Sequence, residues 1–317
     1  MRWTVGGGVE ASARRNSRSG LARCKTSRMD PIEAAEWALS LPEIDPNKPS
    51  PARIYDYWLG GSQNFAVDRQ VGQRALAALP NLADAIRANR AFLGRVVHHL
   101  ASELGVTQFL DLGSGVPTVG NVHEVARYVD PTAKVVYVDV DPVAIAHARA
   151  LLADIDGVEA ILADLRQPEN VLTHPLLLET LDLAKPIAVL MYAVLHFIPD
   201  TEHPEAIVRA YIEHAAPGSY LALSHGAPDT GRPREQGTML NDYQQETGVT
   251  FITRDADQIT TWLTGLEIQP PGLVTIDQWR PEPDIEKPEY VAMYGVLARK
   301  PSAPPVDADQ AASGEVS

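Results

Sequence analysis

FLDLGSG (residues 109–115) joins an apolar run to a carboxylate and two glycines at the point where a helix is expected to begin. Glycine lets the backbone turn tightly and approach a ligand closely. The N-terminus of the following helix offers N–H groups without intrahelical partners. The pattern is typical of nucleotide-cofactor sites in α/β proteins. Gly-x-Gly also occurs in ordinary tight turns. Further sequence patterns are therefore needed to distinguish a cofactor-binding loop from a simple turn.

Two further apolar runs also end in carboxylates. The run 135–139 ends in Asp139, in the place of the ribose-binding acid that lies about 20 residues beyond the glycines of dinucleotide folds. The run 158–163 is followed by Asp164, which fits either a ligand contact or a helix cap or turn. Ligands of open α/β sheets bind outside the carboxyl ends of the strands. We therefore expect Asp111, Asp139 and Asp164 to lie at one edge of a sheet.

The alternation of strands and helices continues downstream. Asp141-Pro142 combines an N-cap residue with a proline at the first helical position and predicts a helix start. We expect a fourth strand over 186–192, a helix over 204–215 and a fifth strand over 219–224. The pattern predicts an open, mostly parallel α/β sheet.

This arrangement resembles the class I S-adenosylmethionine-dependent methyltransferases over roughly 107–300. The resemblance implies a Rossmann-like, mostly parallel seven-stranded sheet with helices on both faces, closed by strands near 273–276 and 290–297. It implies that Asp111, Gly113 and Gly115 line the methionine and ribose of the cofactor. It also implies that Asp139 holds the ribose hydroxyls, that Asp164 faces the adenine amino group, and that 195–197 borders the transferred methyl.

Four other segments carry a closer resemblance: PARIYDYWLGGSQNFAVDR (51–69), ANRAF (88–92), GVPTVGNVHE (115–124) and WRP (279–281). Together they are similar to an actinomycete family of S-adenosyl methyltransferases that was formerly catalogued as a domain of unknown function. The likeness runs from about 51 to 300. It implies S-adenosyl-L-methionine as the cofactor and leaves the methyl acceptor open. Pro117 stands where many methyltransferases have a third glycine.

The segment 55–69 has two interpretations. Its Gly60-Gly61 pair interrupts an amphipathic beginning and is flanked by aromatic and charged residues. It predicts either a lid, with Tyr55, Tyr57 and Phe65 covering the cofactor or acceptor, or a helix–turn–helix that packs its aromatics on the sheet, with Asn64 capping the second helix. The candidate cofactor-binding residues are Asp111, Gly113, Ser114, Gly115, Asp139, Val140, Asp164, Leu165, Tyr192, Tyr57 and Asn64.

Composition and charge restrict the function classes. The 317 residues, 45% of them hydrophobic, suffice for a three-layer core. Residues 1–28 carry seven Lys or Arg against Glu10, so the remainder holds 20 basic and 40 acidic residues. An acidic core disfavours nucleic acid as the substrate, and a small-molecule acceptor is favoured. No run approaches the roughly 20 apolar residues that a bilayer requires. The single cysteine, Cys24, forms no internal disulfide, and we expect a cytoplasmic protein.

The expected organisation has four parts. Residues 1–28 are expected to be a disordered basic tail, 29–104 a helical cap or lid, 105–300 the Rossmann-like core, and 301–317 a disordered tail. The oligomeric state stays open.

A general base is needed only where the acceptor must lose a proton, and histidine is then the natural group. His196 follows the fourth strand and His225 follows the fifth, with Tyr192 as a possible positioning hydroxyl. Either histidine could instead be structural. His123-Glu124 lacks the second histidine that a zinc helix requires, so we expect no metal.

Two other functions share these motifs. A nicotinamide-dependent oxidoreductase is disfavoured because Thr118 stands at the third fingerprint glycine and no Tyr is followed four residues later by Lys. A non-catalytic S-adenosylmethionine sensor or accessory protein stays possible, because methyl transfer does not require a recognisable base.

Overall fold

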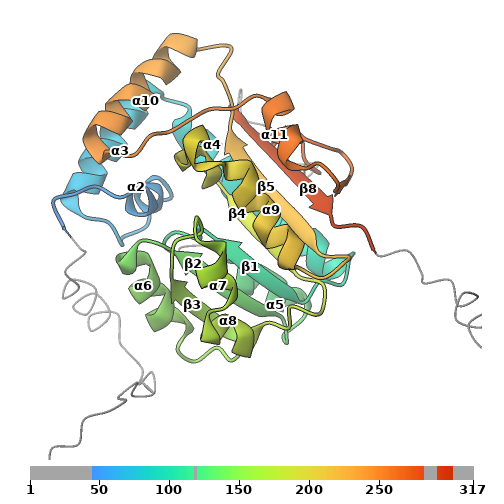
Figure 1. Cartoon of the computed structure of the whole chain (residues 1–317). Coiled ribbons are helices and arrows are strands. Elements are labelled where there is room, and N and C mark those ends of the chain that lie inside the picture. Colours follow the sequence, from blue (N-terminus) through green and yellow to red (C-terminus); the bar gives the residue numbers. More distant parts are fainter. Residues whose placement is uncertain (1–44, 118–119, 282–290, 303–317) are drawn as a thin grey trace, which may run out of the picture.

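An eight-stranded mixed sheet forms the centre of the computed structural model, which describes residues 45–117, 120–281 and 291–302 (Figure 1). The strand order is β3-β2-β1-β4-β5-β8-β6, with β7 also pairing with β8. The first five strands run parallel to one another, and β8 is antiparallel to β5. The strands are β1 (Gln108–Leu112), β2 (Lys134–Asp139), β3 (Val158–Leu162), β4 (Ala188–Tyr192), β5 (Tyr220–Gly226), β6 (Glu267–Ile268), β7 (Val274–Thr275) and β8 (Met293–Arg299).

The expected seventh strand is divided in two. Glu267 of β6 pairs with one end of β8, and Thr275 of β7 pairs near the other end. Between these two strands the chain leaves the sheet. The sheet therefore has eight strands in place of seven, and the mostly parallel, Rossmann-like architecture is confirmed. The predicted strand near 273–276 is found as β7, whereas β6 was not predicted.

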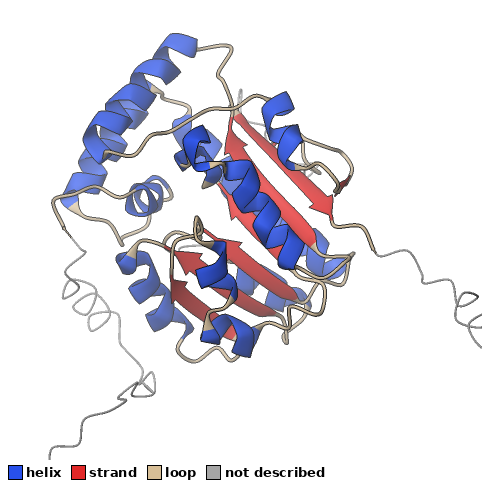
Figure 2. Ribbon diagram, viewed as in Figure 1, coloured by secondary structure: helices blue, strands red, loops and turns tan. Residues whose placement is uncertain are grey.

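Helices cover both faces of the sheet, as predicted (Figure 2). One apolar cluster joins α4 (Leu82–Ser102), α5 (Val122–Val129) and α6 (Pro142–Leu152) to one face. A second cluster joins α7 (Pro168–Leu172), α8 (Pro175–Thr180), α9 (Pro204–His214) and α11 (Ala256–Trp262) to the other. β1 and β4 are buried along their whole length, which fits central parallel strands covered on both faces.

A separate helical layer lies at the edge of the sheet where the parallel strands end (Figure 1). It consists of α2 (Pro51–Trp58), α3 (Ala66–Ala78) and α10 (Pro233–Thr247). Ile54, Val71 and Tyr243 belong to its small apolar cluster, so α2 and α3 pack on α10. Tyr57 packs close to Gly72 of α3, and the Arg53 guanidinium lies over the Phe65 ring, so these two aromatics pack within the helical layer and not on the sheet as expected. Residues 1–44 and 303–317 lie outside the described residues, and so do the expectations for the two tails.

The helix starts follow local sequence signals. Asp141 caps α6 by accepting from Val143 N and Ala144 N, as predicted. Asn64 does not cap α3, because Phe65 is the N-cap residue and the Asp68 carboxylate accepts from its N–H. Within the described residues, no helix combines the length and apolarity that crossing a membrane requires.

Candidate cofactor and acceptor site

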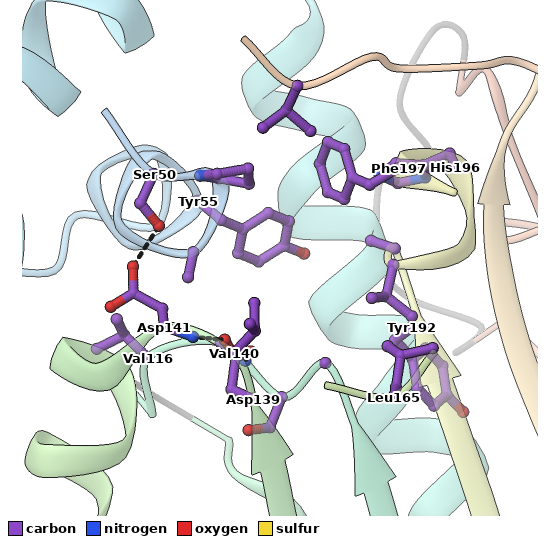
Figure 3. Close-up of a pocket in the computed structure, with 18 of the residues that line it drawn as sticks. Ser50, Tyr55, Val116, Asp139, Val140, Asp141, Leu165, Tyr192, His196 and Phe197 are labelled. Atoms are coloured by element: carbon purple, nitrogen blue, oxygen red, sulfur yellow. Dashed lines mark hydrogen bonds between the residues drawn. The ribbon is translucent and has the colours of Figure 1, made fainter. Parts of the chain in front are cut away.

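A cavity of about 360 Å³ lies between the carboxyl ends of β1–β4 and the helical layer. Its floor carries Asp111, Asp139 and Asp164, the three acids expected at one edge of the sheet. Tyr55 of α2 reaches into the cavity, between the end that holds Asp139 and the end that holds Phe197 and His196 (Figure 3). This volume is within the usual range for small-molecule sites.

The glycine loop after β1 depends on its glycines. Gly113 has φ +72°, and a Cβ there would lie 2.3 Å from Val194 Cγ2. The N–H groups of Gly113 and Ser114 both donate to Val138 O, at 2.8 and 3.1 Å. Gly115, with φ +65°, donates to Asp139 at 2.7 Å. The loop thus folds over the end of β2, and a side chain at Gly113 would prevent that approach.

Asp139 lies at the tip of β2, buried and bonded to backbone. Its Oδ2 accepts from Gly115 N and its Oδ1 from Asp141 N, at 2.7 and 2.8 Å. Burial raises the pKa of Asp139 to about 6, the neighbouring Asp141 charge adds to the rise, and the backbone bonds oppose it. Each carboxylate oxygen has lone pairs beyond its one bond, so Asp139 can still accept from two ligand hydroxyls.

Asp111 is buried beside Asp139 at the end of β1. Burial raises the pKa of Asp111 to about 7, with the Arg90 charge lowering it and the Asp139 charge raising it. Arg90 of α4 lines the same cavity. It forms no ion pair with a described residue, and its buried Nε has no hydrogen-bond partner among them. The site therefore holds a cation available for an anionic ligand group.

Asp164 and its neighbours form the β3 side of the cavity. Arg166 Nη2 lies 2.6 Å from Asp164 Oδ2, and Arg166 also reaches Glu202 at 3.0 Å. Burial by itself raises the pKa of Asp164, but hydrogen bonds from Arg166 hold that pKa below its usual range. Leu165 lines the wall, and Val140 stays 64% exposed although it faces the cavity. An exposed valine that lines a cavity can cover one face of a planar ring.

The two candidate histidines differ in their access to the cavity. His196 lines it, whereas His225 does not. His225 Nδ1 lies 2.8 Å from Gly226 O and its Nε2 lies 3.0 Å from Arg254 Nη1, so both ring nitrogens are engaged. Burial lowers the pKa of His225 to about 4, and the Arg254 charge contributes. This environment is that of a structural histidine.

His196 is buried among aromatic rings. Its ring stacks on Phe251 with centroids 3.9 Å apart, and its Nδ1 accepts from Gly226 N at 3.4 Å. Burial lowers its pKa well below the ordinary value, helped by His225 and Arg254. Because Nδ1 faces an N–H donor, the neutral ring carries its proton on Nε2. His196 is therefore set up to donate a hydrogen bond more readily than to remove a proton.

Arg254 holds the segment that carries His196. Buried to 2% exposure, it donates to Leu195 O at 3.2 Å and to Ile198 O at 2.8 Å, and it pairs with Asp200. These contacts fix the turn η1 (Leu195–Phe197) after β4. Sequence reasoning assigned Arg254 no role.

Tyr192 lies at the end of β4 and lines the cavity. Its buried hydroxyl has no hydrogen-bond partner among the described residues. Burial raises its pKa well above the ordinary value, and the Asp111 charge adds to the rise. The ring points away from Tyr55 and Phe197 (Figure 3). Its hydroxyl is thus placed nearer the β1 acid than the far end of the cavity.

Two predicted cofactor residues are not brought to the cavity. Asn64 Nδ2 donates to Asp56 at 2.7 Å and to Gly61 O at 3.0 Å, which fixes the turn between α2 and α3. Tyr57 packs close to Gly72 on α3. Both side chains therefore hold the helical layer together.

Several residues that line the cavity were not proposed from the sequence. Asn89 donates to the Tyr55 hydroxyl at 2.9 Å and accepts from Ser224 at 2.6 Å, which connects α2, α4 and β5. The segment 88–92 carries part of the family resemblance, but no pattern around Asn89 and Arg90 indicates a chemical role for either residue. Tyr243 and Phe251 come from the region after β5, and tertiary packing brings them to the cavity.

The described residues hold no cluster of three His, Cys, Asp or Glu side chains suited to a metal ion. The His123-Glu124 pair is used locally. His123 contacts the Tyr137 hydroxyl through its backbone N and its Nδ1, at 2.9 and 2.8 Å, and Glu124 accepts from Asn121 N at 2.8 Å.

Known proteins resemble this chain over most of its length. A family model described as S-adenosyl methyltransferase matches residues 38–301. A DUF574 family protein from Streptomyces avermitilis is 37% identical with a TM-score of 0.77, over 81% of this chain and 99% of that one. A Thermobifida fusca protein to which methyltransferase activity is ascribed is also 37% identical with a TM-score of 0.77, over 82% of this chain and 98% of that one. The comparison with curated proteins finds no match.

Proposed function

Because the chain belongs to the S-adenosyl methyltransferase family, we propose that it transfers the methyl group of S-adenosylmethionine to a small molecule held in the cavity beneath α2. The observation that carries the proposal is the enclosure of the cavity. Ser50, Tyr55 and Trp58 cover it from one side, and Met239 and Tyr243 of α10 cover it from another. A site covered in this way suits a small acceptor better than a folded macromolecule.

The residues at the sheet edge fit the cofactor. Asp139 would accept from the two ribose hydroxyls, and the glycine loop at Gly113 would allow close backbone approach. Val140 and Leu165 would cover the adenine ring, with Asp164 at its edge. We assign Arg90 to the carboxylate of the methionine portion, because it lines the cavity without an ion-pair partner among the described residues.

The charges of the site suit a cationic cofactor. The pKa values of Asp111 and Asp139 are raised by burial, to about 7 and about 6, so a positive ligand beside them favours their ionised forms. When bound, S-adenosylmethionine supplies a methyl group on a positively charged sulfur. Positioning and exclusion of water by the protein can contribute roughly 7–11 kcal/mol to such a transfer.

The roles of the remaining residues follow from their position. We propose that His196 contacts the acceptor and that α2 acts as a lid over both ligands. His225 would act on the acceptor only through the surrounding structure, since both its nitrogens are engaged. We also propose a cytoplasmic location, which fits a chain with a single cysteine. The acidic charge supports an acceptor other than nucleic acid.

Radiolabelled methyl transfer into fractions of a cell extract tests this proposal. The protein would be incubated with methyl-tritiated S-adenosylmethionine and either the dialysable or the macromolecular fraction. We expect label in a dialysable product, and none with Asp139→Asn. Label confined to protein or nucleic acid would contradict the small-molecule acceptor. S-adenosylhomocysteine binding without transfer to any fraction would favour the sensor function.

A further inference from the structure

Phe197 and His196 lie at the end of the cavity away from Asp139 (Figure 3), and three further aromatic residues that line the cavity have rings next to theirs or to one another. Neighbouring rings there have centroids 3.9 to 6.4 Å apart. They come from α2, the turn η1, α10 and the loop after α10, so four separate segments converge on this surface. We call it the aromatic wall, and it consists of Trp58, His196, Phe197, Tyr243 and Phe251.

The aromatic wall is incompletely covered by the rest of the protein. Trp58, Phe197 and Phe251 are each only half-buried, although they line a cavity. Apolar surface left in contact with water is unfavourable. A flat apolar molecule placed against these rings would remove that surface from water and gain ring-to-ring contacts.

Charge is absent from the aromatic wall. The charged side chains that line the cavity in the described part of the chain lie on α4 or at and just beyond the ends of β1, β2 and β3: Arg90, Asp111, Asp139, Asp141, Asp164 and Arg166. Behind the wall, the buried Arg254 guanidinium lies 3.0 Å from His225 and contributes to the lowered pKa of His196, of which burial is the main cause. The Asp200 carboxylate pairs with this guanidinium at 2.6 Å. Among the described residues that line the cavity, the carboxylates lie at the other end, so a cationic acceptor would meet apolar rings here.

One hydrogen-bond donor stands in the wall. His196 Nδ1 accepts from Gly226 N, which leaves the ring proton on Nε2, and Nε2 has no partner among the described residues. A donor next to apolar rings suits an oxygen that carries or develops negative charge.

We infer, on the basis of the methyl-transfer function proposed above, that the acceptor is a flat aromatic compound bearing a hydroxyl group. Its ring stacks against the aromatic wall, and its oxygen accepts from His196 Nε2. The hydroxyl releases its proton to water, the oxygen electron pair forms the new bond to the methyl carbon, and the sulfur keeps the electron pair of the broken bond. Opposite charges on oxygen and sulfur cancel in this step. Methylation of a neutral amine would instead form an ammonium ion against the aromatic wall before its proton leaves for water, and apolar surroundings disfavour that charge.

Calorimetric titration with matched probes tests the inference. The protein saturated with S-adenosylhomocysteine would be titrated with 2-naphthol, decahydro-2-naphthol and 2-naphthylmethylamine. We expect 2-naphthol to bind about tenfold tighter than its saturated counterpart, which has a similar shape without the aromatic face, and tighter than the amine. Equal or tighter binding of the saturated alcohol, or of the amine, would overturn the inference.

Variants of the wall identify where the probe binds. Phe251→Leu and Phe197→Leu should each weaken 2-naphthol binding roughly threefold to tenfold and leave S-adenosylhomocysteine binding unchanged. Tyr128→Leu, at an 86% exposed aromatic on α5, is the matched control and should change neither. If both wall variants bind 2-naphthol as the parent does, the inference is wrong.

Failure of the two proposals can be told apart. Binding of S-adenosylhomocysteine without binding of 2-naphthol would overturn the aromatic acceptor alone. Absence of S-adenosylhomocysteine binding would contradict the cofactor function on which it rests.

Discussion

Arg53 on α2 donates from Nη1 to the Asp141 carboxylate at 3.0 Å and so connects the roof of the cavity to the strand end that carries Asp139. Arg53 is only 5% exposed and also donates to Asp68 at 2.8 Å. Ser50, one residue before α2, donates to Asp141 as well (Figure 3). Because Asp141 N bonds to Asp139, the roof and the proposed ribose contact share one hydrogen-bonded network.

Substitution of Arg53 should loosen both the roof and the cofactor site. Arg53→Gln leaves Asp68 and Asp141 buried without their cation, and removing one partner from a buried pair costs about 3–5 kcal/mol. We expect the free energy of unfolding, measured by urea titration, to fall by this amount. We also expect weaker binding of S-adenosylhomocysteine in calorimetry. Arg74→Gln breaks the exposed Arg74–Glu246 pair and should cost about 1 kcal/mol or less. Equal effects of the two variants would argue against a special role for the buried pair.

The glycine loop gives a second prediction. Gly113→Ala places a Cβ 2.3 Å from Val194 at a backbone φ of +72°, so the loop has to move. We expect loss of S-adenosylhomocysteine binding and a lower melting temperature. Gly94→Ala, within α4 and with no atom within 4 Å of the added Cβ, should stabilise the protein by about 0.4–1 kcal/mol. Intact cofactor binding in Gly113→Ala would contradict the loop geometry.

The raised pKa of Asp111 predicts a dependence of stability on pH. Its carboxyl has a pKa of about 7 in the folded protein and an ordinary value of 3.8, so the folded state binds this proton more tightly than the unfolded state does. Protonated Asp111 therefore makes its full contribution to the free energy of unfolding below about pH 4. That contribution is lost as the pH rises to about 7. Buried histidines such as His225, with lowered pKa values, act in the opposite direction.

Comparison of wild type with Asp111→Asn isolates this contribution. Between pH 5 and pH 8, wild type should lose on the order of 2 kcal/mol of unfolding free energy relative to the variant, measured by urea titration at each pH. Parallel curves for the two proteins would show that Asp111 does not titrate in this range. Cofactor affinity of wild type should rise over the same interval, because the ionised carboxylate attracts the cationic ligand.

Arg254 should affect the acceptor end of the cavity and leave the cofactor end intact. Arg254→Lys loses the planar donor set that reaches Leu195 O and Ile198 O together. We expect methyl transfer to fall about tenfold or more, with S-adenosylhomocysteine affinity within about twofold of wild type. The exposed Arg87→Gln on α4 serves as the control and should change neither. A loss of cofactor affinity in Arg254→Lys as large as the loss of turnover would contradict this division of roles.

The acids and glycines at the sheet edge could be predicted because each depends on a local pattern. A buried strand that ends in Asp111 or Asp139 fixes the carboxylate at the edge wherever the strand pairs, and the Gly113 turn follows from the same run. The topology of parallel strands then brings these residues together.

The aromatic end of the cavity could not be predicted in the same way. Trp58 lies far from Tyr243 and Phe251 in the sequence, and the packing of α2 and α3 on α10 places these residues around one space. The sequence predicts that His225 follows a strand, as His196 does, but β5 extends to Gly226 and therefore includes His225. His225 turns to Arg254, a residue whose burial no local pattern indicates. Asn64 resembles a helix cap in sequence, but its side-chain amide donates hydrogen bonds to Asp56 and to Gly61 O instead.

Calorimetric titration of wild type and Asp139→Asn with S-adenosylmethionine, S-adenosylhomocysteine and NADPH tests the central claim most directly, with Asp130→Asn, on the exposed turn after α5, as the control. We predict that wild type and Asp130→Asn bind the two S-adenosyl compounds and not NADPH. Asp139→Asn should lose about 1.5–3 kcal/mol of affinity for each hydrogen bond removed. Unchanged affinity in a folded Asp139→Asn protein, or binding of NADPH in place of the S-adenosyl compounds, would contradict the assignment of the site.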